Sequence, residues 1–309
     1  MFLDNLKTIA LQVGILYLIS LMGFITDKTK IFRQADGKRV IDLLFNIILP
    51  ITIIHTFMTM EYTIEHVKGI LIAFACAFGT HFFGIAVAGA TFRKRSLKER
   101  GIYHYGIVFS NAAFLALPLA KSVIGTEGIF YCSVYVAVFN ILAFTYGIYE
   151  ISGREAKIDI KRIFLNPGSI AVIIGLPLFF IQPEIPYIIS YSMELIGNCN
   201  SPLAMIIFGT FLANSNFKNL LIKKELYFSS FLRLVFIPTC MLGIFRLLGV
   251  TGDLLVAMTI SASAPTASNT AMYAAKYDND TALGSELAAQ SSIFSIITMP
   301  VIVAMASVA

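Results

Sequence analysis

Two stretches of the sequence place proline, serine and asparagine in the middle of apolar runs. The first is 109–118, with Ser110, Asn111 and Pro118, and the second is 261–270. Proline removes a backbone donor from a helix, while serine and asparagine offer the backbone other hydrogen-bond partners. The corresponding residues of the second stretch are Ser263, Pro265, Ser268 and Asn269. Both stretches are therefore predicted to be broken helices.

Binding of a carboxylate is the chemistry that suits such breaks. The second half of a broken helix begins with unpaired N–H groups and a partial positive charge. Two such ends that meet in an apolar interior favour an anion, and neighbouring hydroxyl and amide side chains add hydrogen bonds. The alternative is that the prolines and small residues serve only helix bending and packing. Because the two stretches match each other, we favour the binding interpretation.

Ionisable and amide side chains also occur within apolar runs. Glu286 and Gln290 lie one turn apart and face the same way. They are either an ion-coupling pair or, for Glu286, an interfacial residue near a helix start. Arg233 is expected to snorkel to the membrane surface, the alternatives being anion attraction or a structural pair. His55 and His81 are expected to make packing hydrogen bonds rather than to carry protons.

The composition places the whole chain in a membrane. Of the 309 residues, 57% are hydrophobic and 13% charged, with a mean hydropathy of +0.80. Soluble domains contain about 25% charged residues. A soluble core of this size would not hide so much apolar surface, so we predict an all-α integral membrane protein with ten spans. The expected spans are 6–26, 40–59, 67–92, 101–120, 128–149, 167–182, 187–212, 226–249, 252–275 and 281–306.

The distribution of Lys and Arg predicts the orientation of these spans. The loops after the odd-numbered spans carry 18 of the 23 basic residues, whereas the N-terminus and the loops after the even-numbered spans carry 4. Basic residues concentrate on the cytoplasmic side of membrane proteins. The sequence thus predicts a multi-pass protein of the plasma membrane, the inner membrane in a bacterium, with both termini outside.

Five expected spans precede the basic loop at 150–165 and five follow it. If the halves are repeats, an odd number of spans in each forces them into opposite orientations. We therefore predict two inverted five-helix repeats, residues 1–150 and 151–309. The two broken helices are the fourth span of each repeat, which is the arrangement that points to a substrate site.

With these features the chain resembles the auxin efflux carrier family, which includes plant PIN-type carriers and bacterial members linked to malonate and other carboxylates. The resemblance spans nearly the whole chain, and it rests on the order and spacing of several short motifs. These are Asn46 to Pro50, Ser110-Asn111 through Pro118, Asn166-Pro167, Asn200 to Leu203, Ala264-Pro265 through Asn269, and the polar start of the last span.

The resemblance implies a scaffold of helices 1, 2, 6 and 7 and a transport domain of helices 3–5 and 8–10. Helices 4 and 9 would cross at the substrate site and move by an elevator motion, and a homodimer through the scaffold helices is compatible with this division. In the distantly similar bile-acid sodium symporters, an acid and an amide of the last transport-domain helix bind sodium. By that analogy the coupling ion is Na⁺ or H⁺, with sodium placed at Ser110, Asn111, Glu286 and Gln290.

The resulting prediction is a secondary active transporter that moves a small organic anion, auxin-like or malonate-like, by alternating access. The alternative is a membrane sensor that keeps the transporter fold without transport. No zinc-binding His-Glu-x-x-His motif or phosphate-binding glycine loop occurs in the sequence. We therefore expect no enzymatic activity, no resident metal, no cofactor and no nucleic-acid partner.

Overall fold

The computed structural model describes the chain except for residues 1, 157–159, 216–219, 221 and 309. The described residues are mostly helical, and no strand is found among them. The first half contains α1 (Phe2–Lys28), α2 (Gln34–Leu43), α3 (Leu49–Thr59), α4 (Ile64–Ala90), α5 (Leu97–Val108), α6 (Leu117–Leu142) and α7 (Ile148–Ile151). The second half contains α8 (Ile160–Leu165), α9 (Pro167–Ile181), α10 (Tyr187–Asn198), α11 (Asn200–Ala213), α13 (Lys224–Phe231), α14 (Ile237–Leu247), α15 (Gly252–Ser263), α16 (Thr270–Lys276) and α17 (Thr281–Ala306).

Four short π-helical segments adjoin the α-helices in the described part of the chain. They are η1 (Leu44–Ile48), η2 (Ala112–Ala116), η3 (Ala143–Gly147) and η4 (Leu232–Phe236). In three of them a proline follows at the start of the next helix, in α3, α6 and α14. Proline cannot donate to the preceding turn, so a widened turn before it is a local way to keep the helix continuous.

Within the described part of the chain, seven helical stretches are long and apolar enough to cross a membrane, by length and composition. They are Phe2–Lys28, Arg39–Thr59, Ile64–Ala90, Ala112–Ile151, Tyr187–Ala213, Lys224–Leu247 and Thr281–Ala306. Two shorter helices, α9 and α15, are also apolar. The prediction of an all-α chain with several membrane-spanning helices is therefore confirmed, whereas the number of ten spans stays a prediction.

The longest of these stretches contains a sharp kink. Ile124 and Gly125 have non-helical backbone angles, and Gly125 has a positive φ of 65°, a conformation that glycine adopts without steric cost. The two arms pack closely, since a Cβ atom on Gly128 would lie 2.4 Å from the carbonyl oxygen of Ala120. The break falls between the two spans expected at 101–120 and 128–149.

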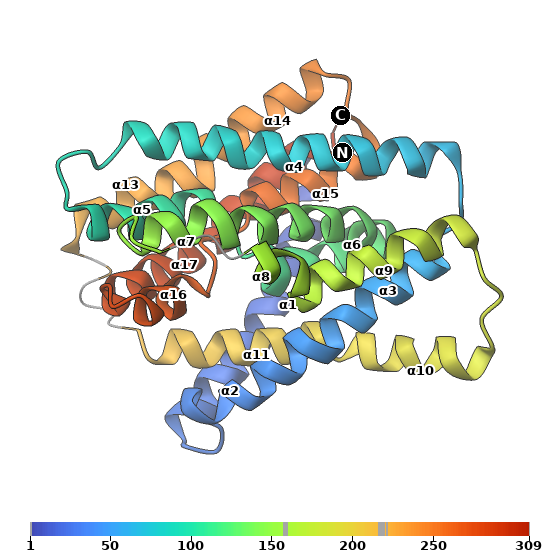
Figure 1. Cartoon of the computed structure of the whole chain (residues 1–309), viewed down its shortest axis with the longest axis horizontal. Helices are drawn as coiled ribbons and strands as arrows, with labels where there is room; N and C mark the ends of the chain where they lie inside the picture. The colour runs from blue at the N-terminus through green and yellow to red at the C-terminus, as the bar shows by residue number, and fades with distance from the viewer. Residues whose placement is uncertain (1, 157–159, 216–219, 221, 309) are drawn as a thin grey trace.

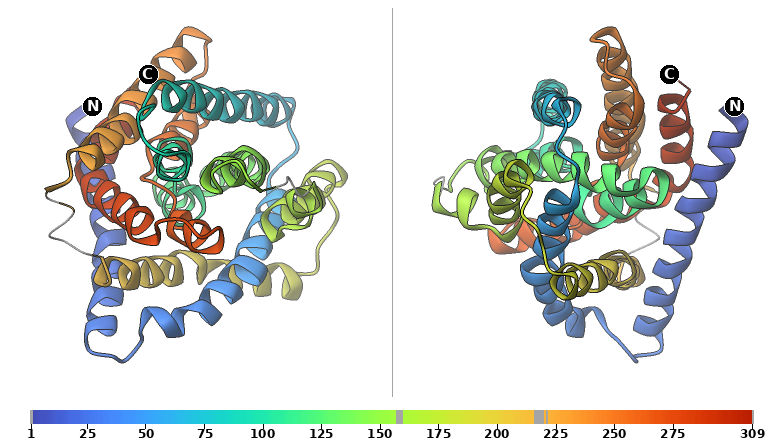
Figure 2. Two further views of the ribbon diagram at one scale, coloured as in Figure 1. Left: turned by 60° about the vertical axis from the view of Figure 1, so that its left-hand side comes forward. Right: turned by 90° about the vertical axis from the view of Figure 1, so that its right-hand side faces the viewer.

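The two ends of the chain lie side by side (Figures 1 and 2), and the Asn5 amide donates to the carbonyl oxygen of Ser307 at 3.1 Å. Figure 1 shows α4 and α14 along one side of the molecule and α10 and α11 along the opposite side. The segments 109–118 and 261–270 are almost entirely buried between these outer helices. The polar stretches of the sequence therefore lie inside the bundle.

Glycine allows α1 and α11 to touch backbone to backbone. A Cβ atom on Gly209 would lie 1.8 Å from the carbonyl oxygen of Ser20, and one on Gly23 would lie 2.0 Å from that of Ile206. Close contact through small residues is a common way for membrane helices to associate. In the scaffold that we expect, α1 and α11 belong to helices 1 and 7, so this contact would hold the scaffold together.

We expect Gly209→Ala to destabilise the protein. The added methyl group must push α1 away from α11, and forcing extra atoms into a packed contact costs about 1–3 kcal/mol. The measurement is the thermal unfolding midpoint of the purified protein in detergent. Gly14→Ala is the matched control, because a Cβ atom there meets nothing within 4 Å. Equal midpoints for the two variants would show that the glycine contact does not constrain the packing.

Candidate functional site

Both polar stretches interrupt their helices. The first helix, α5, ends at Val108, and the chain is extended at Phe109 before it turns into η2 at Ala112. The second, α15, ends at Ser263, with Ala264 extended and Pro265 unable to donate a backbone hydrogen bond. Helix resumes at Thr270. We call the two interruptions, residues 109–111 and 264–269, the crossover.

The two interruptions pair with each other. Ser110 and Thr266 form an isolated antiparallel bridge. The Asn111 N–H donates to the Pro265 carbonyl at 2.7 Å, and the Ala267 N–H donates to the Phe109 carbonyl at 2.9 Å. Backbone groups released by each break are thus satisfied by the other, as buried polar groups require.

Side chains tie the crossover to its surroundings. The Thr266 hydroxyl donates to the Gly106 carbonyl at 2.9 Å, and the Thr266 N–H donates to the Ser291 hydroxyl of α17 at 3.1 Å. The Tyr105 hydroxyl donates to Asn269 Oδ1 at 3.1 Å. These contacts make the crossover a rigid unit that joins α5, α15 and α17.

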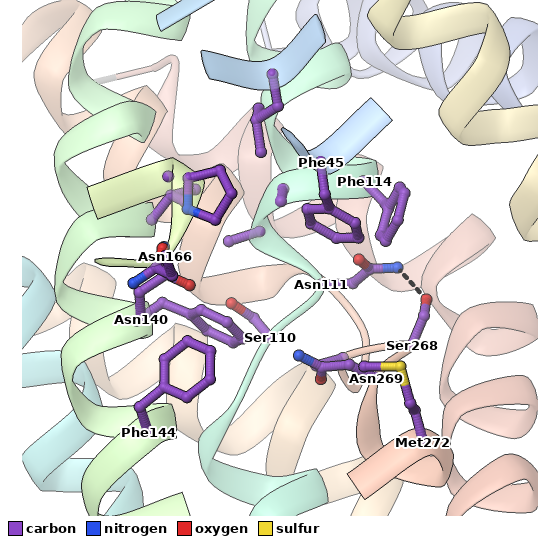
Figure 3. A pocket seen from close by; sticks show the side chains of 18 of the residues that line it. Phe45, Ser110, Asn111, Phe114, Asn140, Phe144, Asn166, Ser268, Asn269 and Met272 are labelled. Atoms are coloured by element: carbon purple, nitrogen blue, oxygen red, sulfur yellow. Dashed lines mark hydrogen bonds between the residues drawn. The ribbon is translucent and has the colours of Figure 1, made fainter. Parts of the chain in front are cut away.

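A cavity of about 190 Å³ lies beside the crossover (Figure 3). Hydroxyls and amides face it from two sides: Ser110, Asn111, Ser268 and Asn269 from the crossover, and Asn140 and Asn166 from the opposite wall. The other side chains are mainly apolar, including Phe45, Leu49, Phe114, Val136, Phe139, Phe144, Met272 and Tyr273. Among the described residues that line the cavity, none is Asp, Glu, His, Lys or Arg. We call this space the crossover cavity.

Asn111 is the central polar side chain. Its Nδ2 donates to the Ser268 hydroxyl at 2.9 Å, which spans the two halves of the crossover. An amide has two N–H donors and one oxygen, so groups remain for a ligand. Directly after Asn111 the chain enters η2, which continues into α6, and the first N–H groups of a helix have no carbonyl partners within that helix. The Ala112 N–H donates instead to the Ser110 carbonyl at 2.8 Å. The Asn111 amide and the start of η2 therefore place hydrogen-bond donors on this side of the crossover cavity.

The structure brings four of the seven predicted binding residues to the crossover cavity: Ser110, Asn111, Ser268 and Asn269. The other three lie in or near the crossover but do not line the crossover cavity. Pro118 lies in the first turn of α6. Ser263 donates back to the Ile260 carbonyl at 3.2 Å. Pro265 supplies the carbonyl that accepts from Asn111.

The predicted ion-coupling pair contacts a different part of the molecule. Both residues are buried, and Glu286 Oε2 lies 2.5 Å from the Lys223 ammonium nitrogen. Gln290 accepts from the Ser230 hydroxyl at 3.0 Å and donates to the Leu220 carbonyl at 2.5 Å. No group of three or more His, Cys, Asp or Glu side chains suited to a metal occurs in the described part of the chain. Sodium binding by Glu286 and Gln290 with Ser110 and Asn111 stays a prediction.

Asn140 was not identified from the sequence as a site residue. It lies half-buried on the wall of the crossover cavity, and a Cβ atom on Gly168 would lie 2.7 Å from its Nδ2. Beside it, Asn166 caps α9 by accepting from the Ser169 N–H at 2.9 Å. The available signal was a single amide within the apolar run 128–149, since polar residues inside spans are rare and often functional.

The expectation that Arg233 snorkels to the membrane surface is wrong. Its side chain is fully buried and hydrogen-bonds to backbone carbonyls rather than to solvent. The histidines make local contacts. His81 Nδ1 lies 2.7 Å from the Ala77 carbonyl oxygen, and His55 Nε2 lies 3.1 Å from the Ser190 hydroxyl.

Comparison with known families gives one result for the chain as a whole. Residues 8–303 match the family model described as membrane transport protein. A comparison with curated proteins found no match. The matched region includes the crossover and every residue that lines the crossover cavity.

Proposed function

Because the chain belongs to the membrane transport protein family, that of the auxin efflux carriers, we propose that it is a secondary active transporter of a small organic anion. The observation that carries this proposal is the crossover cavity, where amides and hydroxyls meet at two interrupted helices inside a multi-pass membrane protein. Members of this family are transporters and not enzymes. The crossover cavity is the substrate site in this proposal.

The proposed architecture is two inverted five-helix repeats, residues 1–150 and 151–309, with ten spans. The adjacent termini support an even number of crossings, because an odd number would place them on opposite sides of the membrane. The stretch Ala112–Ile151 is divided by its kink into two spans, and α5 lengthens the first of them. With α9 and α15 added as well, the seven long stretches become ten spans. The distribution of basic residues supports the proposal that both termini lie outside the plasma membrane.

An anion is favoured because the crossover cavity offers hydrogen-bond donors without a carboxylate. Moving a charge out of water is costly unless dipoles and hydrogen bonds replace its hydration. A helix start contributes roughly 0.3–1 kcal/mol when exposed and up to about 2 kcal/mol when partly buried. Hydrogen bonds to an ionised group add about 1.5–3 kcal/mol each. Since α16 has only seven residues, most of the helix contribution comes from η2 and α6.

The same walls favour one carboxylate over two. The six amides and hydroxyls lie beside phenylalanine, methionine and leucine side chains, and no cation lines the crossover cavity among the described residues. A second carboxylate would have to leave water for an apolar wall without a partner. We therefore propose a monocarboxylate with an apolar body as substrate, in preference to a malonate-like dicarboxylate.

The proposed mechanism is alternating access, with a transport domain that moves against the scaffold. Asn166, which lines the crossover cavity, follows the basic loop that we place in the cytoplasm, so this conformation would face inward. On the opposite side the Lys121 ammonium donates to Asn198 Oδ1 at 2.6 Å, which links α6 to α10. That contact must break when the crossover moves outward.

The direct test is transport by the purified protein in liposomes. We expect uptake of labelled aromatic and branched-chain monocarboxylates, and less than a tenth of that rate for dicarboxylates of similar size. Thermal unfolding with the same compounds measures binding, since a ligand of the folded state raises stability. Binding without uptake would favour the sensor alternative. Neither binding nor uptake by any carboxylate would contradict the proposal.

A further inference from the structure

Arg233 holds the ends of both interrupted helices. Its Nε donates to the Ala264 carbonyl at 3.0 Å, and its Nη1 donates to the Ile107 and Val108 carbonyls at 3.1 and 3.2 Å. Its Nη2 donates to the Ala262 carbonyl. These four carbonyls lie at the C-terminal ends of α5 and α15. One side chain therefore satisfies backbone acceptors on both sides of the crossover.

Arg233 places a positive charge inside the bundle. The side chain is fully buried, and no ion pair involving it occurs among the described residues. An unpaired buried cation is unfavourable unless other groups replace its hydration. Helix C-termini can do so, since each carries about −0.5 elementary charge. Two such ends match the single positive charge of one guanidinium group.

This cancellation of charge changes the electrostatic environment of an anion in the crossover cavity. Interrupting two helices places two negative C-terminal ends close to the donors that face a substrate. Without a cation, those ends would oppose an anion bound beside Asn111. With Arg233 in place, the negative ends are neutralised and the donor groups around Asn111 act alone.

In transporters with broken helices, unwound carbonyls and half-helix C-terminal ends are where sodium or a proton binds. Here those acceptors are taken by a side chain that cannot leave and that stays charged at any physiological pH. We propose that Arg233 is a tethered counter-cation of the crossover, so that anion binding and transport require no sodium. This inference rests on the proposed transport function, and it is the alternative to the sodium site at Glu286 and Gln290.

The transport arm of the test compares sodium-containing liposomes with liposomes in which choline replaces sodium throughout. We expect the natural protein to take up its monocarboxylate at rates within twofold in the two media. Arg233→Met should lose at least tenfold in anion affinity, and Arg233→Lys should keep part of it because the charge remains with fewer donors. Arg246→Met is the matched control, since Arg246 lies in the same helical stretch, Lys224–Leu247, and is exposed.

A second arm does not depend on transport. Thermal unfolding of the natural protein should be the same in sodium and in choline. Arg233→Met should unfold at lower temperature and regain stability in low millimolar guanidinium, which can occupy the vacated place. Arg246→Met should show no such rescue. If the natural protein takes up no anion in either medium, the proposed function fails while this arm still reports on Arg233.

Three results would overturn the inference. One is uptake by the natural protein that falls tenfold or more without sodium. Another is Arg233→Met that binds the anion as tightly as the natural protein does. The third is a natural protein that sodium stabilises but choline does not. Should Arg233→Met fail to fold, Arg233→Lys and the sodium comparison of the natural protein decide.

Discussion

Asn111→Ala is expected to weaken anion binding about tenfold, because about 1.4 kcal/mol corresponds to that factor and one charge-assisted hydrogen bond contributes that much or more. The variant also loses the Asn111 to Ser268 bond across the crossover. It keeps the backbone bond from residue 111 to Pro265, so the fold should survive. The measurement is the dissociation constant of the transported monocarboxylate for the purified protein.

Asn111→Asp separates shape from charge at the same position. It is nearly isosteric, but it places a carboxylate beside the bound anion, so binding should fall further than in Asn111→Ala. Asn46→Ala is the matched control, because Asn46 is exposed and its amide donates to the Asp42 carbonyl of its own helical stretch. Unchanged affinity in both Asn111 variants would place the substrate elsewhere.

Ala113→Phe is expected to reduce uptake to below a tenth of the natural rate. Ala113 is half-buried and lines the crossover cavity in the first turn after the break. A phenyl ring there occupies a space of only about 190 Å³. Because the cavity already exists, the added ring can be accommodated without forcing the helices apart, so the loss should fall on the substrate rather than on folding.

The measurement is initial uptake at matched protein levels, together with thermal unfolding. Ala86→Phe provides the control, since Ala86 is exposed on α4 and the same substitution there adds the same bulk outside the cavity. Uptake by Ala113→Phe equal to that of Ala86→Phe would mean that the substrate does not pass through the crossover cavity.

The sequence predicted the local features of this molecule well. Hydropathy predicted apolar helices, and the proline, serine and asparagine stretches predicted where two of them are interrupted. Both predictions depend on backbone preferences of neighbouring residues, which sequence alone contains. Four of the seven binding candidates line the crossover cavity for the same reason.

The features that the sequence did not predict depend on contacts between distant segments. Arg233 is 31 residues from Ala264 and 126 from Ile107, and its carbonyl partners exist only because two other helices are interrupted. Snorkelling was the natural expectation for a long cation in a span. Likewise, Asn140 becomes a cavity residue only when α9 begins beside it. The Lys223 to Glu286 pair spans 63 residues.

Several contacts together keep the crossover in its interrupted conformation. Pro265 alone does not hold α15 open, since two backbone bonds between the breaks and four bonds from Arg233 would have to be lost before the helix re-formed. The rigidity of the crossover therefore comes from several elements together. Such a unit can move as a body between the two sides of the membrane without losing its binding geometry.

Substrate protection of a single cysteine at position 113 tests most directly whether the anion binds in the crossover cavity. The free cysteines Cys199, which is exposed, and Cys240, which is half-buried, are first replaced by serine, while Cys76 and Cys132 are buried. Ala113→Cys is then alkylated with a maleimide from the cytoplasmic side. We expect the transported monocarboxylate to slow alkylation at concentrations near its dissociation constant, and a dicarboxylate to have no effect. An alkylation rate that a transported anion leaves unchanged would contradict binding at this site.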